Sequence, residues 1–453
     1  MSIEKIRDFV SANQLEFLDP LYTLLRQKSI SAQNDGVVDC ANLVMEMMKE
    51  LGITTQLIET EGHPVVFGEL MDPANTFTLL IYGHYDVQPP EPLEKWESNP
   101  FEPEIRNARI YARGAGDNKG QLVAQLLGVK TYLETMGKMP INLKFVFEGE
   151  EEIGSIHLAS FVEQHKELLK ADLVYTSDGS LHESGSPTIL LGVRGMLAIE
   201  LEAKGADRDN HSGNNGNIVP NPVWKLLDLL ETMRDKNGKV LIEGFYDNIL
   251  PLTEYEKQLL KKLPFDKKSV GEKIGYPQLE MSGETYYRKL TMEPTFNICG
   301  VESGYTGEGI KTIIPSTARL KMDIRLVVNQ DPIDIFNKIK AHVSLHAPDV
   351  QVTYLGSMEP SRTNAELEVV KTVAQAVHQA FHTEPLIQPA MGGSLPNYVW
   401  TKILELPSVI VPYANFDQGN HSPNENIKIH NFLSGIVCTA HVIHTLGKVA
   451  REN

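Results

Sequence analysis

The sequence predicts an α/β protein with a mostly parallel sheet, helices on both faces of that sheet, and an inserted α+β domain. In the first and last parts of the chain, buried apolar runs alternate with helical patterns, which is typical of parallel sheets. In the middle part, strands alternate apolar and polar residues, as antiparallel strands with one exposed face do. The 453 residues also exceed what one hydrophobic core usually organises. We therefore expect residues 1–193 and 359–453 to form one domain, and residues 194–358 to form the insertion, a lid or dimerisation domain.

The first part of the chain begins with helices and continues with strands and helices in alternation. Apolar residues recur every three or four positions in the helical segments, and the strands are short apolar runs bounded by polar residues. The expected elements are helices over 3–27 and 38–51, strands over 54–60, 64–71 and 76–84, a helix over 119–133, a strand over 141–148, a helix over 155–166 and a strand over 171–176.

The insertion has a different pattern, and the last part of the chain returns to the first one. Alternation of apolar and polar residues predicts exposed-face strands in the insertion, separated by amphipathic helices. The expected elements are strands over 196–203, 320–327 and 350–355, helices over 221–233 and 332–346, and then a helix over 365–381, a strand over 408–411 and a helix over 428–450.

Composition disfavours several classes of partner. The net charge of −17 argues against nucleic acid or an anionic membrane. The longest apolar runs, 77–82 and 142–147, are far shorter than the ~20 residues that cross a bilayer. The N-terminal pattern is amphipathic and broken by charges, so we expect no signal peptide. Cys40, Cys299 and Cys438 are widely spaced and form no CxxC pattern, which favours a reducing cytoplasm over a disulfide framework.

Five short segments place metal-binding or proton-handling side chains at expected strand ends or in loops. Divalent zinc or manganese takes imidazole nitrogens and carboxylate oxygens, and a paired site needs one carboxylate shared by both ions. Together the segments indicate a two-metal hydrolase site. The residues are His84 and Asp86, Asp117, Glu151 and Glu152, Asp178, and His421.

The first two segments each allow a structural interpretation as well. Side chains 84 and 86 point the same way if the strand continues, so Asp86 can orient the imidazole of His84. A solvated loop pair is the alternative. The loop over 113–120 lacks the glycine spacing of a nucleotide-binding loop. Asp117 is instead a candidate bridging carboxylate at the start of a helix, and a structural helix cap is the alternative.

Four glutamates crowd together directly after an expected strand. Glu148, Glu150, Glu151 and Glu152 repel one another unless cations neutralise them. A metal pair and a solvated acidic loop are both consistent with this pattern. Adjacent glutamates project differently, so one can bind metal while the other abstracts a proton from a metal-bound water. Asp178 and His421 are uninformative when each is taken alone.

The motifs in this order resemble the M20 family of metallopeptidases over nearly the full length of the chain. Residues 82–90 (YGHYDVQPP), 96, 100–103 and 111–121 especially resemble the carnosinase and cytosolic nonspecific dipeptidase branch. The motifs are Gly83-His84-Tyr85-Asp86, Gly116-Asp117-Asn118-Lys119-Gly120, Glu151-Glu152-Ile153-Gly154-Ser155, Ser177-Asp178 and His421-Ser422-Pro423.

The resemblance implies a ligand set for two divalent ions, zinc or manganese, with cobalt also possible. By that resemblance, one ion is held by His84, Asp117 and Asp178, and the other by Asp117, Glu152 and His421. Asp117 bridges the two ions. Glu151 is the general base and acid, and Asp86 orients His84. The implied fold is a catalytic α/β domain with an inserted lid that usually also dimerises.

The resemblance also implies roles for residues outside the metal ligands. His211 matches the lid histidine that reaches across a dimer as an oxyanion stabiliser. Thr312 and Arg325 match residues that contact the backbone carboxylate of the substrate, and the glycine-rich loop with Gly393 and Ser394 does likewise. These assignments agree with physical expectation, because Arg grips a carboxylate with two hydrogen bonds and glycine lets backbone amides approach it.

The sequence thus predicts a cytoplasmic, homodimeric, two-metal hydrolase. We expect it to cleave the amide bond of dipeptides or short peptides with a free C-terminal carboxylate, through a metal-bridging water activated by Glu151. An N-acyl amino acid deacylase or desuccinylase is the alternative, because it uses the same chemistry. A non-enzymatic binding protein would show gaps in the ligand set, and the sequence shows none. Residues 235–293 match the family least and are a candidate lid elaboration that shapes the pocket or the dimer.

Overall fold

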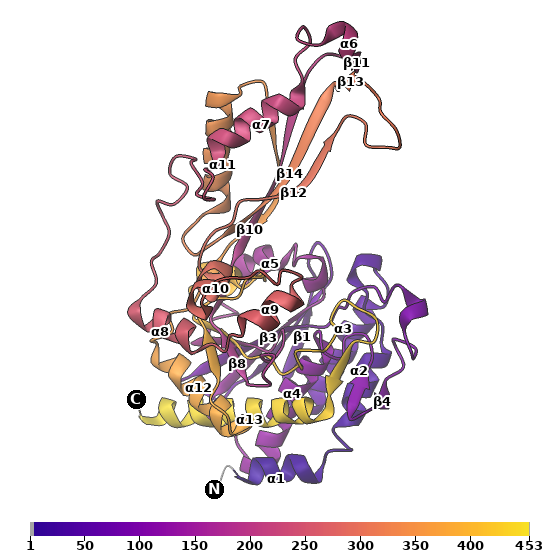
Figure 1. The fold of residues 1–453 in the computed structure, drawn as a ribbon. Helices are drawn as coiled ribbons and strands as arrows, with labels where there is room; N and C mark the ends of the chain where they lie inside the picture. Colours follow the sequence, from indigo (N-terminus) through magenta and orange to yellow (C-terminus); the bar gives the residue numbers. More distant parts are fainter. Residues whose placement is uncertain (1–3, 453) are drawn as a thin grey trace.

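The computed structural model describes residues 4–452 and consists of two lobes joined by extended strands (Figure 1). The larger lobe contains an eight-stranded sheet and both ends of the described chain, and the smaller lobe contains a four-stranded sheet. Strands from both sides of the insertion build the large sheet, since β17 and β18 return to it late in the chain. The insertion boundaries at 193/194 and 358/359 stay a prediction.

The large sheet is parallel at its centre, where the strand ends come together. β6, β3, β7 and β18 are parallel neighbours, and the antiparallel pairs lie toward the two edges. This confirms the predicted mostly parallel sheet. In spatial order the strands are β1 (Thr54–Ile58), β2 (Val65–Leu70), β6 (Asn142–Glu148), β3 (Thr78–His84), β7 (Leu173–Thr176), β18 (Ser408–Ile410), β8 (Thr188–Leu190) and β17 (Leu386–Gln388).

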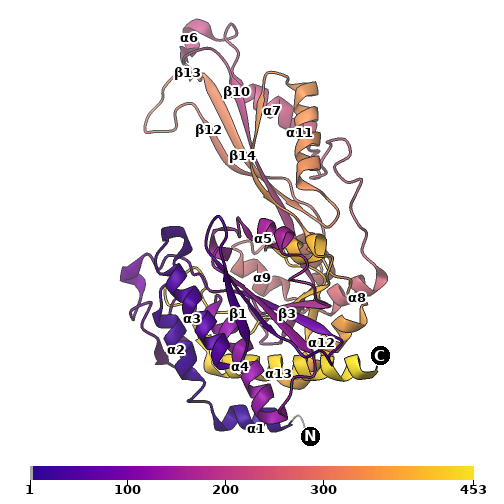
Figure 2. The same ribbon diagram turned by 180° about the vertical axis from the view of Figure 1, so that it is seen from behind.

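Helices cover both faces of this sheet, as predicted (Figures 1 and 2). The main core forms between alternate strand residues and the helices α1 (Glu4–Ala12), α2 (Leu18–Arg26), α3 (Val37–Glu50), α4 (Lys119–Met136), α12 (Glu368–Phe381) and α13 (Ile429–Glu452). The opposite face packs against α5 (Leu158–Gln164) and the short helix η4 (Val399–Ile403). Among the described residues, one helical stretch, Ile429–Arg451, is long and apolar enough to cross a membrane, and 72% of its most apolar window is buried in the protein.

The helix predicted over residues 3–27 is wrong in one respect, because the structure has two helices there. A turn over 13–17 separates α1 from α2, and residue 3 lies outside the described residues. Pro20 lies in the first turn of α2. Proline is tolerated in a first turn but lacks the N–H that an uninterrupted helix would need.

The smaller lobe is an antiparallel sheet with helices on one face, which agrees with the alternating sequence pattern. Every second residue of β10 is buried, and two capped helices with proline at their first turn cover that face. The strands are β12 (Asn297–Ser303), β14 (Thr317–Leu326), β10 (Gly195–Lys204) and β15 (Gln351–Met358), and the helices are α7 (Pro222–Met233) and α11 (Pro332–His346). At its far tip lie β11 (Asn210–His211), α6 (Ser212–Asn215) and β13 (Ile313–Ile314) (Figure 1).

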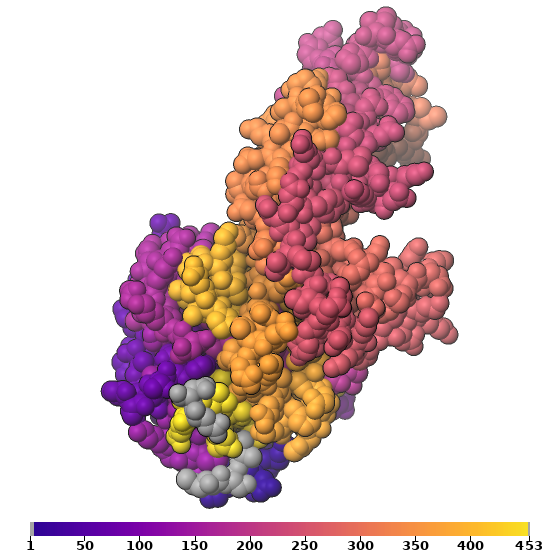
Figure 3. All heavy atoms as spheres, turned by 90° about the vertical axis from the view of Figure 1, so that its left-hand side faces the viewer, coloured from indigo at the N-terminus to yellow at the C-terminus, as the bar shows by residue number. Residues whose placement is uncertain are grey.

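Three helices from the middle of the insertion lie on the larger lobe rather than on the small sheet. They are α8 (Glu254–Lys262), α9 (Lys267–Lys273) and α10 (Gly283–Thr291) (Figures 1 and 3). Leu259 of α8 joins the main core, and Glu256 forms an ion pair of 3.4 Å with Arg362. None of these three helices was predicted from the sequence.

Shorter elements connect these parts. A three-stranded sheet lies next in sequence to the segments that carry Asp117 and His421, and a two-stranded pair joins the lobes. They are β4 (Glu104–Arg106), β5 (Arg109–Tyr111) and β19 (Asn426–Lys428), then β9 (Gly192–Val193) with β16 (Ser361–Arg362), and the short helices η1 (Ser31–Gln33), η2 (Leu93–Lys95) and η3 (Glu151–Ile153).

Candidate metal centre

The predicted metal ligands gather at the carboxyl edge of the large parallel sheet. His84 is the last residue of β3 and lies opposite Glu148 at the end of β6. Asp178 follows β7, and Asp117 precedes α4. Parallel strands end at the same edge, so residues far apart in the sequence meet there.

Asp117 is the centre of the cluster because its two carboxylate oxygens face two different histidines. Its Oδ1 lies 3.2 Å from Nε2 of His84, and its Oδ2 lies 3.2 Å from Nε2 of His421. Glu152 completes the second side, with Oε2 at 3.0 Å from the same nitrogen of His421. This is the arrangement that a carboxylate shared between two sites requires.

Asp178 and Glu151 complete the side around His84. Oδ2 of Asp178 lies 3.7 Å from Nε2 of His84, and Oε2 of Glu151 lies 3.9 Å from it. That nitrogen is buried and makes no hydrogen bond, although three carboxylates surround it. The structure thus brings together all five predicted ligands and Glu151.

The charges of the cluster are poorly balanced without a cation. Burial raises the pKa of Glu151 well above its usual range, although the nearby His84 opposes this. Burial and the charge of Asp117 raise the pKa of Asp178 to about 6. Hydrogen bonds with Asp117 and Glu152 raise the pKa of His421 to about 10. A divalent cation would let the carboxylates ionise together, so the donors fit such an ion.

Asp86 holds two parts of the cluster at once. Its Oδ1 lies 3.2 Å from Nδ1 of His84, the contact expected of an orienting carboxylate. Its two oxygens also accept hydrogen bonds from the backbone N–H groups of Glu151 and Glu152, at 3.2 and 3.1 Å. Asp86 therefore fixes the glutamate loop as well as the imidazole.

The four crowded glutamates divide into two pairs. Glu148 is buried and accepts hydrogen bonds from the hydroxyls of Tyr82, at 2.5 Å, and Ser155, at 2.8 Å. Glu150 accepts a backbone hydrogen bond of 2.9 Å from His63 and lies 2.9 Å from Nδ1 of His157. These two stabilise the loop, which leaves Glu151 and Glu152 for the cluster.

Glu425 is a supporting residue that was not predicted from the sequence. Its two oxygens accept hydrogen bonds from the backbone N–H groups of Gly114, Gly116 and Asp117, at 2.9 to 3.1 Å. One oxygen also lies 2.6 Å from the buried guanidinium of Arg113. Glu425 thereby fixes the loop that carries Asp117. It is separated from that loop by about 300 residues, and no local pattern marks the pairing.

The predicted carboxylate-binding residues Arg325, Ser394 and Gly393 meet at the junction of the lobes. Nη1 of Arg325 donates to Oγ of Ser394 at 2.8 Å, and Ser394 donates to the backbone carbonyl of Arg194 at 2.7 Å. The carbonyl of Gly393 accepts from the N–H of Arg194 at 3.2 Å. A small cavity connects this loop to the cluster, and its lining includes Glu151, Asp178, Leu395, Pro396 and Asn397.

His211 and Thr312 are not brought to the cluster. Both lie at the far tip of the smaller lobe, where the N–H of Ser212 donates to the carbonyl of Thr312 at 3.0 Å (Figure 1). His211 is exposed, and its Nδ1 accepts a hydrogen bond from the N–H of Gly213. Within one chain, these two residues contribute nothing to the metal centre.

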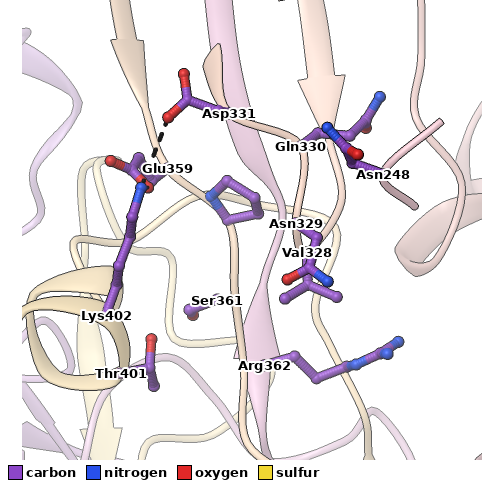
Figure 4. Close-up of a pocket in the computed structure, with 11 residues that line it drawn as sticks. Asn248, Val328, Asn329, Gln330, Asp331, Glu359, Ser361, Arg362, Thr401 and Lys402 are labelled. Carbon is purple, nitrogen blue, oxygen red and sulfur yellow. Dashed lines mark hydrogen bonds and ion pairs between the residues drawn. The ribbon is translucent and has the colours of Figure 1, made fainter. Parts of the chain in front are cut away.

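A larger cavity of about 630 Å³ lies at the junction of the lobes, away from the ligands (Figure 4). Lys402 projects into it and pairs with Glu359 and, at 3.7 Å, with Asp331. Polar side chains make up much of its lining, including Asn248, Gln330, Ser361 and Thr401. The cavity separates the two lobes next to the strands that join them.

Comparison with known proteins identifies this arrangement. The sequence profile of Peptidase family M20/M25/M40 matches residues 80–445. The Cys-Gly metallodipeptidase dug1 of Schizosaccharomyces pombe is 28% identical over 99% of this chain and 99% of its own length. The Beta-Ala-His dipeptidase of Rattus norvegicus is 26% identical over 96% of this chain and 93% of its own length.

A solved structure agrees with the fold. The M20 family metallo-carboxypeptidase Sso-CP2 from Sulfolobus solfataricus superimposes with a TM-score of 0.86 and is 38% identical, covering 96% of this chain and 99% of its own. This likeness extends over both lobes. The predicted resemblance is therefore confirmed at the level of the family and the fold.

Proposed function

This chain belongs to peptidase family M20/M25/M40, and we propose that it is a metal-dependent dipeptidase acting on substrates with a free C-terminal carboxylate. One observation carries the proposal. Asp117 presents its two oxygens to His84 and His421 at 3.2 Å each, with Glu151 beside the same cluster. The full-length similarity to enzymes named Cys-Gly metallodipeptidase and Beta-Ala-His dipeptidase supports the substrate class.

We assign His84, Asp117 and Asp178 to one divalent ion, and Asp117, Glu152 and His421 to the other. Each set supplies one imidazole and two carboxylates, and these donors suit zinc or manganese, with cobalt as a third candidate. The buried, unbonded Nε2 of His84 supports this assignment. When bound, two such ions would polarise the scissile carbonyl and lower the pKa of water at the site.

Glu151 is the residue that would move the proton. Burial raises the pKa of its carboxyl, and a raised pKa makes a carboxylate a better proton acceptor. Its neighbour Glu152 lies 3.0 Å from His421 and is engaged in the ligand set. The two adjacent glutamates therefore have separate roles, with Glu151 taking a proton from water and later giving it to the departing amine.

Arg325, Ser394 and Gly393 would hold the substrate's C-terminal carboxylate. The guanidinium of Arg325 already contacts Ser394 at 2.8 Å, and arginine can bind a carboxylate through two hydrogen bonds. The cavity beside this loop is also lined by Glu151 and Asp178. A carboxylate bound there would hold the neighbouring amide bond close to the metal centre.

His211 and Thr312 would act from the second subunit of a homodimer. β12 is an edge strand of the smaller lobe, and its Ile298 and Val301 side chains are 43% and 71% exposed. An exposed apolar edge strand can pair with a second copy of itself. We propose that such a dimer brings the tip of one subunit to the metal centre of the other, where His211 would stabilise the oxyanion.

We further propose a cytoplasmic location. Cys40, Cys299 and Cys438 are all free thiols in the structure. Free cysteines are ordinary in a reducing compartment.

The test is hydrolysis of a dipeptide panel, Cys-Gly, Ala-Gly and β-Ala-His, by metal-stripped protein before and after addition of zinc or manganese. Metal-dependent release of the C-terminal amino acid is expected. The Glu61→Gln variant, changed at an exposed glutamate, is the control for the removal and re-addition of metal. Cleavage of N-acetyl or N-succinyl amino acids without dipeptide cleavage would overturn the proposal in favour of a deacylase.

A second candidate is a carboxypeptidase that removes the last residue from longer peptides. The 38% identity to the Sulfolobus solfataricus metallo-carboxypeptidase favours this activity. Both candidates share the metal centre and the carboxylate site, and they differ in what the enzyme accepts on the N-terminal side. N-blocked tripeptides distinguish them, because a carboxypeptidase cleaves these substrates and a dipeptidase that needs a free amine does not.

A further inference from the structure

A cavity of about 280 Å³ lies beside the metal centre, between α9, α10 and the edge of the large sheet. Ser180 in its wall follows Asp178 in the same loop, and Phe416 belongs to the loop that also carries His421. The cavity thus borders two segments that hold metal ligands. Leu190 in its wall also belongs to the same apolar cluster as Leu395, which lines the small cavity beside Glu151 and Asp178.

The wall of this cavity is mostly apolar and is exposed to solvent. Side chains of Ile274, Leu290 and Phe416 are 55%, 39% and 45% exposed there. Tyr286 and Tyr287 also line it. Several large apolar side chains that face one open cavity mark a binding site more often than scattered surface residues do.

The two sides of the cavity are fixed to each other. Nζ of Lys273 on α9 lies 2.9 Å from Glu183 and 3.7 Å from the ring centre of Phe416. On the other side, Leu290 of α10 lies against the loop that carries Gly392, Gly393 and Ser394, since a β-carbon at Gly392 would lie 3.2 Å from Cδ1 of Leu290. Helices α9 and α10 therefore close a pocket onto the larger lobe.

The position of Leu290 decides which part of a substrate would enter. Gly392 precedes Gly393 and Ser394, the residues proposed above to hold the C-terminal carboxylate. The side chain of the C-terminal residue leaves the same α-carbon as that carboxylate. With the carboxylate bound by this loop, the side chain would therefore start next to the wall formed by Leu290.

We propose that this pocket binds the side chain of the substrate's C-terminal residue and selects large apolar and aromatic ones. The inference rests on the proposed peptidase function. It gives the segment over 250–293 a role, because α9 and α10 supply one wall of the pocket. Lys273 and Glu183 also line the pocket but neutralise each other in an ion pair, which leaves the rest of the lining suited to apolar groups.

The experiment compares kcat/KM for Ala-Phe and Ala-Gly with the zinc- or manganese-loaded full-length protein. The wild type is expected to favour Ala-Phe. Leu290→Ala is expected to lower the ratio of the two kcat/KM values by about tenfold, the low end for loss of apolar pocket contacts. Leu290→Trp, which fills the pocket, should lower the ratio further. Ile274→Ala, at an exposed position, provides a second measurement of the ratio if the Leu290 variants fold poorly.

Tyr276→Ala is the matched control, because Tyr276 lies between α9 and α10, is 55% exposed and is not part of the pocket wall. It should leave the ratio as in the wild type. Wild-type preference for Ala-Gly, or unchanged ratios in the Leu290 and Ile274 variants, would overturn the pocket assignment while peptidase activity stands. A wild type that cleaves neither dipeptide with either metal would overturn the proposed function and this inference with it.

Discussion

Asp117 is the residue around which the centre is built, and Glu425 is the residue that holds it in place. Three backbone N–H groups and Arg113 converge on the buried Glu425 carboxylate. The Asp117 side chain can thus face both histidines without being oriented by a metal. The candidate ligands could be proposed from the sequence because their short motifs occur together and in order, although Asp178 and His421 are uninformative when each is taken alone. Glu425 could not, since its partners lie about 300 residues away.

Glu425→Gln should weaken metal binding while leaving the ligands in place. The amide keeps the size of the carboxylate but presents a donor to backbone N–H groups and leaves Arg113 buried without a counter-charge. Loss of a supporting partner of this kind typically costs about 10- to 100-fold in metal affinity. Competition with a chelator measures the change. Glu366→Gln, at an exposed glutamate, should bind zinc as the wild type does, and equal affinities for both variants would contradict the role of Glu425.

Glu151→Gln should lower kcat and leave metal binding unchanged. The change removes the proposed proton acceptor and keeps Glu152, His421 and the other ligands. Positioned acid and base groups typically contribute about 10² to 10⁴ in rate, so kcat should fall by at least the lower factor. Metal content is measured on the same samples by mass spectrometry. Loss of bound metal in parallel with activity would instead indicate that Glu151 is a metal ligand.

At the scale of elements, the site depends on parallel strands that end together and on helices that hold them. β3 and β7 are neighbours, so His84 and the residues after Thr176 meet without any sequence proximity. The alternation of buried apolar runs with helical patterns made this part of the fold predictable from the sequence. Helices α8, α9 and α10 were not predicted. They are short, and what positions them is packing on the larger lobe, including Leu259 in its core, which local periodicity does not reveal.

Trp400 in η4 packs on the face of the sheet opposite the main core, and replacing it tests how much this packing contributes to stability. It is fully buried, and its ring lies 5.0 Å from that of Tyr82, whose hydroxyl donates to Glu148. Trp400→Ala should lower the free energy of unfolding by about 3–5 kcal/mol, the usual cost of emptying such a site. Trp224→Ala, on the surface of α7 with Trp224 at 65% exposure, is the matched control. Urea unfolding followed by circular dichroism makes the comparison, and similar losses for both variants would contradict the assignment.

At the scale of the whole molecule, the proposed metal-binding and substrate-binding residues are distributed over the two lobes. The larger lobe holds the ligands, and Arg325 reaches it from β14 of the smaller lobe. His211 and Thr312 lie at the opposite end of that lobe (Figure 2). The sequence motifs pointed to these candidate residues but could not show this separation, because it follows from the length and direction of the strands that join the lobes.

Mixing two inactive variants tests whether His211 acts across a dimer. In such a dimer each site combines Glu151 of one subunit with His211 of the other. Glu151→Gln and His211→Ala homodimers should both be poorly active. Unfolding, mixing and refolding them together should restore activity at about a quarter of all sites, because half of the dimers are mixed and each mixed dimer has one intact pair. Refolded single variants are the controls. If His211 instead reached the metal centre of its own chain by lobe closure, no mixed dimer would contain an intact pair, and activity would stay at the level of the single variants.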